Sequence, residues 1–226
     1  MVWIKICGIT NEEDALKIAS LRAHALGFIL STESVRKIEP DKAKEIILAT
    51  KDKFINKQAK KRPSFVGVFV NENINKVTEI AEKLSLDYIQ LSGDETPDYL
   101  KKIKKHNKNI KLIKLIRVKD NVSSFEVISK QMLKFKKAAD FFLLDTFKEN
   151  IYGGTGKSFN WEIVKGLGRD FPVILAGGLD CENVAVAIKM VKPFGIDAST
   201  KLEESPGKKD IGKVEIFIKN AVKKVD

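Results

Sequence analysis

Short runs of apolar and β-branched residues alternate with longer, mostly polar segments along the whole chain. Runs of this length, bounded by Gly, Pro, Asn and Asp, are typical of buried β-strands rather than of helices. Eight such runs occur, and we expect each of them to form a strand. They cover residues 2–7, 25–30, 65–70, 88–91, 110–118, 141–145, 173–176 and 195–198.

The segments between these runs carry apolar residues at helical spacing. The clearest of them, residues 73–84, places Ile74, Val77 and Ile80 on one face, as an amphipathic helix does. We therefore expect a helix after each strand. The expected helices cover residues 11–21, 41–50, 73–84, 96–106, 123–138, 160–167, 181–191 and 210–222.

Eight strand–helix repeats imply parallel strands joined by crossover helices, and two arrangements satisfy this pattern. A closed (β/α)8 barrel takes about 250 residues, whereas an open doubly wound sheet would carry G-x-G-x-x-G after its first strand. The first predicted strand is followed by Gly8-Ile9-Thr10 instead. We therefore expect an α/β fold in which residues 1–226 form one TIM barrel with parallel strands. The polar segment 51–62 is interpreted as a solvated extension and not as a linker between domains.

The charge of the chain has two interpretations. With 41 Lys and Arg against 30 Asp and Glu, the formal net charge of +11 suits either a nucleic-acid binder or a solvated lysine coat. Arginine is the better side chain for forked phosphate or base recognition, and it contributes little here. The lysines are spread over the whole chain and interleaved with acids. This pattern favours the coat and no nucleic-acid partner.

Cysteine content and hydropathy indicate where the protein resides. Two cysteines in 226 residues exclude a disulfide scaffold and suit a reducing compartment. The longest apolar runs are far shorter than the roughly 20 residues of a membrane helix. The N-terminus carries no apolar stretch of the kind found in secretory signals. We expect a cytoplasmic protein without a membrane partner.

Polar and glycine residues follow the last two predicted strands, where function collects in barrels of this type. Gly177-Gly178 comes directly after the seventh strand, and Ser199-Thr200 follows the eighth. Glycine lets backbone N–H groups approach an anion, and phosphate sites often lie in these two loops. The alternative is that Gly177 and Gly178 serve two ordinary turns. The position favours a phosphate site.

Three residues at or near strand ends are candidates for chemistry. Cys7 ends the first strand; a lone cysteine is usually a small core residue, but at a barrel mouth it can act as a base or nucleophile. Asp145 closes a buried apolar strand, and partial burial would suit it to act as a general acid. Asp197 lies in the eighth strand, where a structural hydrogen bond to loop amides is expected. Strand alternation places Lys5 on the same side as Cys7, inside the barrel.

The remaining motifs carry weaker signals. The glycine-rich segment 152–157 resembles the end of a P-loop, but Ile151 stands where that motif requires glycine. The segment follows the sixth strand, where it is either a loop that folds over substrate or a surface loop without a chemical role. Cys181 is interpreted as packing. No spacing of Cys, His and carboxylates indicates a metal site.

Five motifs in register resemble phosphoribosylanthranilate isomerase. They are Lys5–Thr10 (KICGIT), Gln90-Leu91-x-Gly93, Leu143–Asp145 followed by Gly153–Lys157 (GGTGK), Ala176–Leu179 followed by Glu182-Asn183-Val184, and Pro206–Asp210 (PGKKD). The resemblance runs from residue 2 to about residue 220. It implies a single catalytic barrel in tryptophan biosynthesis.

The resemblance also implies an activity and a set of roles. The family converts N-(5-phosphoribosyl)anthranilate to the carboxyphenylamino-deoxyribulose phosphate by an Amadori rearrangement, with no cofactor. The resemblance assigns Cys7 as general base, Asp145 as general acid, and Arg36 as the partner of the anthranilate carboxylate. It implies substrate-binding roles for the residues Gly154, Gly156, Gly177, Gly178, Asp197, Ser199 and Thr200.

Two positions depart from the pattern that the resemblance implies. Ser92 stands where most members of the family have histidine, and Lys201 stands where members usually have glycine after the eighth strand. We interpret Lys201 as an added cation near the phosphate. Two other functions remain open at this point: another phosphosugar enzyme on the same barrel, and a basic nucleic-acid binder. The partner is expected to be a small phosphosugar–anthranilate molecule, and the chain a monomer or homodimer.

Overall fold

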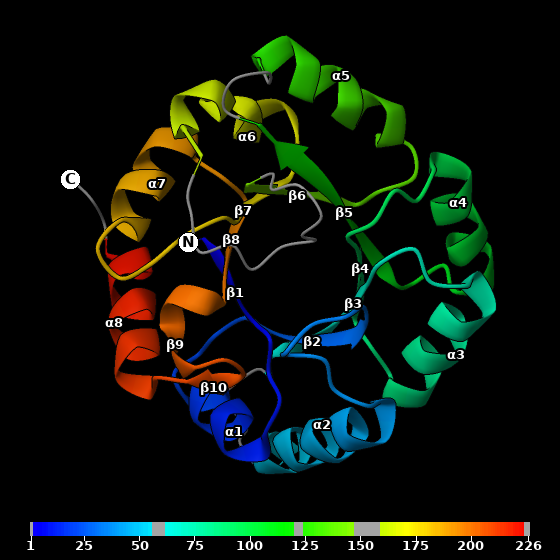
Figure 1. The fold of residues 1–226 in the computed structure, drawn as a ribbon, viewed down its shortest axis with the longest axis vertical. Helices are drawn as coiled ribbons and strands as arrows, with labels where there is room; N and C mark the ends of the chain where they lie inside the picture. The colour runs from blue at the N-terminus through cyan, green and yellow to red at the C-terminus, as the bar shows by residue number, and fades with distance from the viewer. Residues whose placement is uncertain (1, 56–61, 120–123, 147–158, 224–226) are drawn as a thin grey trace.

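The eight predicted strands form a closed, all-parallel barrel (Figure 1). The computed structural model describes residues 2–55, 62–119, 124–146 and 159–223. Each predicted strand is confirmed, and no strand end differs from its prediction by more than one residue. The strands are β1 (Trp3–Cys7), β2 (Ala25–Ser31), β3 (Ser64–Phe69), β4 (Tyr88–Leu91), β5 (Lys111–Val118), β6 (Phe141–Thr146), β7 (Val173–Leu175) and β8 (Gly195–Ala198).

Helices surround this barrel as an outer ring (Figure 1). They are α1 (Glu12–Ser20), α2 (Pro40–Ile55), α3 (Ile74–Leu84), α4 (Pro97–His106), α5 (Phe125–Phe135), α6 (Leu167–Asp170), α7 (Val184–Val191) and α8 (Ile211–Val222). Several begin at a side-chain cap; the Asn11 side chain, for example, accepts a hydrogen bond from the Asp14 N–H. No helix in the described part of the chain is long and apolar enough to cross a membrane.

Two expectations about the helical layer were wrong. The polar segment 51–62 was expected to be an extension, but its first part, through Ile55, continues α2, because Phe54 is buried. The predicted helix 160–167 is a 3-10 turn, η1 (Trp161–Val164), followed by the short α6. Gly166 separates them with φ +85°, a left-handed conformation that ends a helix.

Strand alternation sorts the core into two layers. One set of side chains packs between the strands and the helices, and includes Ile4 and Ile6 of β1. The opposite faces of the strands fill the barrel with a smaller apolar cluster: Ala25, Val66, Ile113, Leu115, Leu143, Ile174 and Ala176. Lys5 alternates with Ile4 and Ile6 and is fully buried, as the strand pattern predicted.

A short antiparallel hairpin follows β8 and lies near α1 (Figure 1). The chain passes through the 3-10 turn η2 (Thr200–Leu202) into β9 (Glu203–Ser205) and β10 (Lys208–Lys209). Two contacts hold the hairpin to the start of the chain: the Lys209 N–H donates to the Asp14 carboxylate at 2.8 Å, and the Thr10 hydroxyl donates to the Gly207 carbonyl. The end of the chain is therefore fastened beside the strand that carries Cys7.

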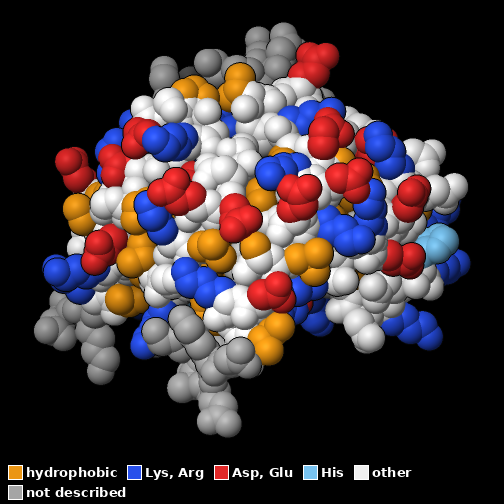
Figure 2. Space-filling model, turned by 90° about the horizontal axis from the view of Figure 1, so that it is seen from below, with side chains coloured by type: hydrophobic (Ala, Val, Ile, Leu, Met, Phe, Trp, Pro, Cys, Tyr) orange, Lys and Arg blue, Asp and Glu red, His pale blue; other side chains and the backbone are white. Residues whose placement is uncertain are grey.

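The surface charges form a mixed coat. On the face drawn in Figure 2, Lys and Arg side chains are interspersed with Asp and Glu, and no patch of one sign covers that face. Many exposed lysines pair with an acid on the same helix, as Lys17 does with Glu13 and Lys42 with Glu45. This arrangement agrees with the expected lysine coat.

We predict that Gly168→Ala destabilises the fold, because a Cβ at this position in α6 would lie 2.3 Å from the Lys192 carbonyl oxygen at the end of α7. Overpacking of this kind costs about 1–3 kcal/mol in the free energy of unfolding, measured by urea denaturation. Gly212→Ala in α8 is the matched control. Its Cβ would meet only Asp210, at 3.4 Å, so we expect unchanged or slightly higher stability. Equal stability of the two variants would contradict this packing.

Candidate active site

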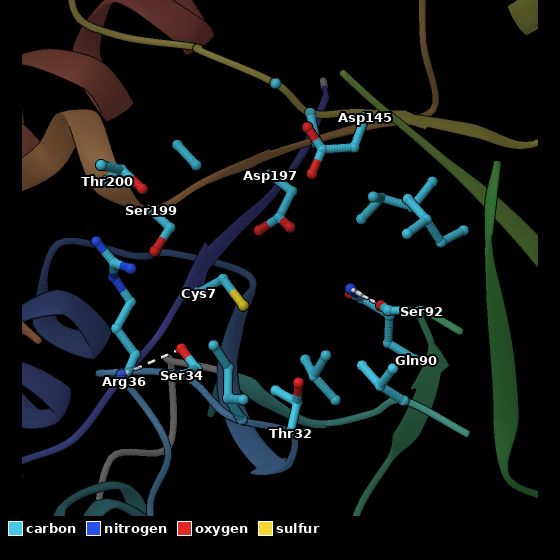
Figure 3. Close-up of a pocket in the computed structure, with 18 of the residues that line it drawn as sticks. Cys7, Thr32, Ser34, Arg36, Gln90, Ser92, Asp145, Asp197, Ser199 and Thr200 are labelled. Carbon is cyan, nitrogen blue, oxygen red and sulfur yellow. Dashed lines mark hydrogen bonds between the residues drawn. The ribbon is translucent and has the colours of Figure 1, made fainter. Parts of the chain in front are cut away.

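A cavity of about 490 Å³ opens at the carboxyl ends of the strands (Figure 3). It collects the predicted site residues from elements that are distant in sequence. Those lining it are Cys7, Arg36, Asp145, Gly177, Gly178, Asp197, Ser199 and Thr200. The predicted residues Gly154 and Gly156 lie outside the described residues. The volume is in the range of small-molecule sites.

Cys7 ends β1 and turns its sulfur into the cavity (Figure 3). Its side chain is 8% exposed. Gly27 faces it from β2, and a Cβ on Gly27 would lie 2.8 Å from the sulfur, so only glycine leaves this room. Burial raises the pKa of the Cys7 thiol, while the positive charge of Lys5 opposes that rise. Cys7 is therefore a reachable thiol held largely in its protonated form near neutral pH.

Asp145 ends β6 in the same cavity (Figure 3). Its Oδ1 accepts a hydrogen bond of 2.7 Å from the Thr146 N–H. Protein atoms crowd the carboxyl group, and this desolvation raises the pKa of Asp145 to about 6 despite the hydrogen bond. A carboxyl group with a pKa near neutrality can give or take a proton under physiological conditions.

Asp197 has a different partner from the one expected. Its Oδ2 accepts a hydrogen bond of 2.7 Å from the Lys5 ammonium, inside the barrel, so the expected bond to loop amides is wrong. The reason is register: β1 pairs with β8 so that Lys5 and Asp197 are direct neighbours. The Oδ1 atom of Asp197 is buried and has no hydrogen-bond partner among the described residues. Because Asp197 also lines the cavity, a ligand hydroxyl could satisfy this oxygen.

The loop after β7 has the geometry of an anion cradle. Gly177 and Gly178 adopt φ of +85° and +65°, and a Cβ on Gly177 would lie 3.0 Å from Oδ1 of Asp145. The Asn183 side chain fixes the loop by donating to the Gly178 carbonyl at 2.9 Å. Left-handed glycines direct backbone N–H groups outwards, which suits a phosphate.

Ser199 and Thr200, which follow β8, line the same cavity as these glycines. Lys201 follows them and also lines the cavity, and its side chain is exposed. Its role as a cation near the phosphate stays a prediction.

Arg36 lies at the cavity edge and is fixed by an acid. Its guanidinium donates to Glu203 through Nε at 2.8 Å and through a terminal nitrogen at 2.7 Å. Glu203 also accepts from the buried Lys209 at 2.7 Å, and Lys209 donates in turn to the Ser199 hydroxyl at 3.2 Å. One carboxylate thus orients both Arg36 and the lysine that holds Ser199. No local sequence pattern identified Glu203 or Lys209 as a site residue, although Lys209 belongs to the motif Pro206–Asp210.

The comparisons with known proteins point in one direction. The sequence model of the family described as N-(5'phosphoribosyl)anthranilate (PRA) isomerase matches residues 4–220. Among curated relatives, the N-(5'-phosphoribosyl)anthranilate isomerase of Pelobacter propionicus is 38% identical over 98% of this chain and 96% of its own length. That of Trichlorobacter lovleyi is 40% identical over 98% of both chains.

The chain belongs to the N-(5'-phosphoribosyl)anthranilate isomerase family.

Solved structures agree with this assignment. The phosphoribosyl anthranilate isomerase of Thermotoga maritima superposes with a TM-score of 0.82 at 36% identity, over 98% of both chains. Another phosphoribosyl anthranilate isomerase structure, with a TM-score of 0.79 at 35% identity over 98% of both chains, holds reduced 1-(o-carboxyphenylamino)-1-deoxyribulose 5-phosphate. Membership in the isomerase family favours the isomerase over the two alternatives, another phosphosugar enzyme on the same barrel and a nucleic-acid binder.

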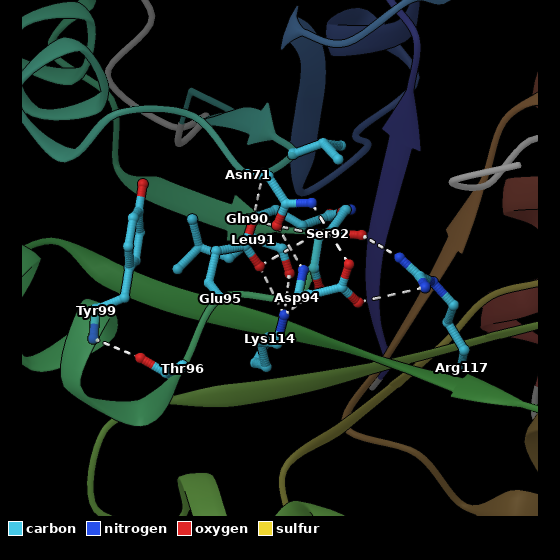
Figure 4. A network of polar contacts seen from close by, with 12 residues as sticks. Asn71, Gln90, Leu91, Ser92, Asp94, Glu95, Thr96, Tyr99, Lys114 and Arg117 are labelled. Carbon is cyan, nitrogen blue, oxygen red and sulfur yellow. Dashed lines mark hydrogen bonds and ion pairs between the residues drawn. The ribbon is translucent and has the colours of Figure 1, made fainter. Parts of the chain in front are cut away.

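Ser92, one of the two departures from the isomerase pattern, lines the cavity just after β4. Its hydroxyl accepts a hydrogen bond of 3.0 Å from the Gln90 side chain. A buried network holds the adjacent loop in place (Figure 4). In it Lys114 of β5 donates to Glu95 and to the Gly93 carbonyl, both at 2.7 Å. The smaller serine therefore sits on a rigid support.

The described residues contain no group of three or more His, Cys, Asp or Glu side chains that could hold a metal ion. The polar side chains that line the cavity include one thiol, three carboxylates, an amide, an arginine, a lysine and several hydroxyls. These groups suit proton transfer and anion binding.

We predict that Glu203→Gln lowers stability in a pH-dependent manner. Burial opposes the charge of Glu203, but hydrogen bonds from Arg36 and Lys209 outweigh it and hold the pKa below its usual value. A carboxylate with a lowered pKa stabilises the folded state above its unfolded-state pKa, and this stability is lost as pH falls through the folded-state pKa. We expect a loss of about 1.5–3 kcal/mol in the free energy of unfolding at pH 7, shrinking in acid.

The neighbouring acid supplies the control for this experiment. Glu204 pairs with Lys208 on the exposed side of the same hairpin. Glu204→Gln should change the free energy of unfolding by no more than about 0.5 kcal/mol. A loss for Glu203→Gln that is the same at all pH values would contradict the ionic origin of its contribution.

Proposed function

We propose that this chain catalyses the Amadori rearrangement of N-(5'-phosphoribosyl)anthranilate to 1-(2-carboxyphenylamino)-1-deoxyribulose 5-phosphate in tryptophan biosynthesis. An acid protonates the ring oxygen, so that the furanose opens to an imine. A base then removes the proton from the second sugar carbon, which gives an enolamine that tautomerises to the ketone. The imine nitrogen accepts the electron pair, so the reaction requires no cofactor.

The observation that carries the proposal is the presence of Cys7 and Asp145 in one cavity that Gly177, Gly178, Ser199 and Thr200 also line. In this proposal Asp145 is the general acid at the ring oxygen and Cys7 is the general base at the second carbon. A thiolate is a compact base, and the deep position of Cys7 at the end of β1 suits a proton bound to carbon. Each group of this kind typically contributes about 10²–10⁴-fold to the rate.

The protonation states require an exchange of one proton. The pKa of Asp145 is about 6, and burial raises the pKa of Cys7 above that of an ordinary thiol. At pH 7 most molecules therefore carry an ionised Asp145 and a protonated Cys7. The reactive form has the same number of protons, with one moved from Cys7 to Asp145. This form is a minority at every pH, and its share is largest between the two pKa values.

The substrate phosphate is proposed to bind between the two loops at the cavity end. The backbone N–H groups of Gly177 and Gly178 approach it from one side, and Ser199 and Thr200 from the other. The loop that carries Gly154 and Gly156 keeps its proposed role in binding substrate. This arrangement matches the phosphate position typical of TIM barrels, after strands seven and eight.

Two polar groups are proposed to hold the rest of the substrate. Glu203 occupies one edge of the Arg36 guanidinium, and the remaining N–H donors can receive the anthranilate carboxylate. The unpartnered Oδ1 of Asp197 can accept a hydrogen bond from a ribose hydroxyl. Both groups are held in place by ion pairs, so little conformational freedom is lost on binding.

Location and assembly complete the proposal. The free cysteines Cys7 and Cys181 suit a reducing cytoplasm. The Thermotoga maritima protein, which is 34% identical and covers 98% of this chain, is described as dimeric. We propose a cytoplasmic monomer or homodimer that binds a small phosphosugar–anthranilate substrate.

We predict that Cys7→Ala and Asp145→Asn each lower kcat by about 10²–10⁴-fold, because each removes one proton-transfer group. Activity is measured as the loss of substrate fluorescence. Cys181→Ala is the control, since this second cysteine donates to the Lys213 carbonyl away from the cavity. It should keep kcat within about twofold. Full activity of either cavity variant would remove that residue from the mechanism.

We predict a bell-shaped pH dependence of kcat/KM. Below the Asp145 pKa of about 6 both groups are protonated and the base is lost; above the raised pKa of Cys7 both are ionised and the acid is lost. kcat/KM should therefore rise as pH passes 6 and fall only in alkali. If kcat/KM instead fell as the pH rises through 6, activity would require a protonated Asp145 in the most populated form of the enzyme, and the exchange of one proton would be contradicted.

A further inference from the structure

The ion pair between Lys5 and Asp197 lies inside the barrel, directly behind Cys7. Lys5 is fully buried, and its ammonium donates to Asp197 at 2.7 Å. Lys5 and Cys7 are two residues apart on β1, so their side chains point to the same face of the strand. Gly27 has no side chain, and this leaves room for both residues: a Cβ on Gly27 would lie 2.8 Å from the Cys7 sulfur and 2.9 Å from Cε of Lys5.

This pair is a poor device for stability alone. Removing two charges from water costs several kcal/mol per ion, and apolar residues of similar volume often stabilise a core equally well or better. The neighbouring interior positions of this barrel, such as Val66, Ile113 and Ile174, are apolar. A charged pair beneath the thiol is therefore explained better by its effect on the site than by its effect on the fold.

We propose that Lys5 is a positioning residue for the base: its ammonium, anchored by Asp197, stabilises the thiolate form of Cys7. The proposal rests on the proposed role of Cys7. The ammonium has three N–H donors, of which Asp197 accepts one, so donors remain for a thiolate on the same face of β1. When Cys7 loses its proton, the positive charge of Lys5 stabilises the thiolate at a buried position that water does not solvate. Deprotonation then places a second anion beside the ammonium.

Other charged groups also face Cys7, and their contributions differ. Asp197 on β8 disfavours the thiolate, and Lys209 on β10 favours it. Arg36, in the loop after β2, is also close enough to interact with it. Glu203 neutralises both Arg36 and Lys209 through direct hydrogen bonds. Lys5 is the cation with the largest effect on the pKa of Cys7, ahead of Lys209, and Asp197 opposes it.

The two members of the pair should therefore act on Cys7 in opposite directions. In a Cys181→Ser background, the pH dependence of Cys7 alkylation by iodoacetamide reports its apparent pKa. We expect Lys5→Met to raise the midpoint and Asp197→Asn to lower it. A neighbouring charge typically changes a pKa by about 1–3, so the thiolate fraction at pH 7 should change at least about tenfold in each variant. The double variant should lie between the two.

A second buried lysine supplies the matched control. Lys114 pairs with Glu95 at 2.7 Å, and its side chain is 4% exposed, but it belongs to the network at the end of β4 (Figure 4). Replacing that pair by Lys114→Met with Glu95→Gln should leave the midpoint of Cys7 alkylation unchanged. Thermal unfolding monitors the fold of every variant. If Lys5→Met does not fold, Asp197→Asn still tests the proposal, because this substitution keeps the side-chain volume.

A purely structural role for the pair predicts different results. Midpoints that move in the same direction in Lys5→Met and Asp197→Asn, or that do not move in either, would overturn the proposal. The turnover assay separates this proposal from the one on which it rests. In one outcome the alkylation midpoints move in opposite directions in the two variants, while the pH profile of kcat/KM does not change. This outcome would support Lys5 as the partner of the Cys7 thiolate and would overturn the role of Cys7 as the base.

Discussion

The pairing of β1 with β8 is the constraint on which the site depends. It closes the barrel, and its register places Lys5 beside Asp197 at a distance that permits a direct ion pair. Two residues further along β1, Cys7 reaches the cavity that Ser199, just after β8, also lines. A shift of one residue would turn these side chains outwards, because successive side chains of a strand alternate between its two faces. The strand pairing that closes the barrel therefore also brings the site residues together.

The charges around the cavity form two groups, one of two residues and one of three. Lys5 pairs with Asp197 on the same strand face as Cys7, whereas Glu203 accepts hydrogen bonds from both Arg36 and Lys209. In both groups a carboxylate holds the cationic side chain, so the cation keeps a fixed orientation instead of moving freely in solvent. The net charge of +11 acts less specifically: it attracts a substrate that carries a phosphate and a carboxylate, with an effect that salt weakens.

Local patterns predicted the strands well, because a strand is formed by residues close in sequence. Runs of apolar residues define the eight strands, and barrel geometry places whatever follows each strand at one mouth, which is how Cys7, Asp145 and Gly177 were identified. The partners of those residues could not be predicted in the same way. The contact of Arg36 with Glu203 joins residues 167 positions apart, and that of Lys5 with Asp197 joins residues 192 apart. The helix predicted at residues 160–167 was wrong because Gly166 adopts a left-handed conformation there.

The central claim is that one cavity holds the phosphate at the β7 and β8 loops while Cys7 and Asp145 act on the sugar. A crystal structure of this chain with reduced 1-(o-carboxyphenylamino)-1-deoxyribulose 5-phosphate tests that claim most directly. We predict the phosphate between Gly177-Gly178 and Ser199-Thr200, with the Cys7 sulfur about 3–3.5 Å from the second sugar carbon. A ligand whose phosphate binds elsewhere, or whose sugar does not contact Cys7, would contradict the account.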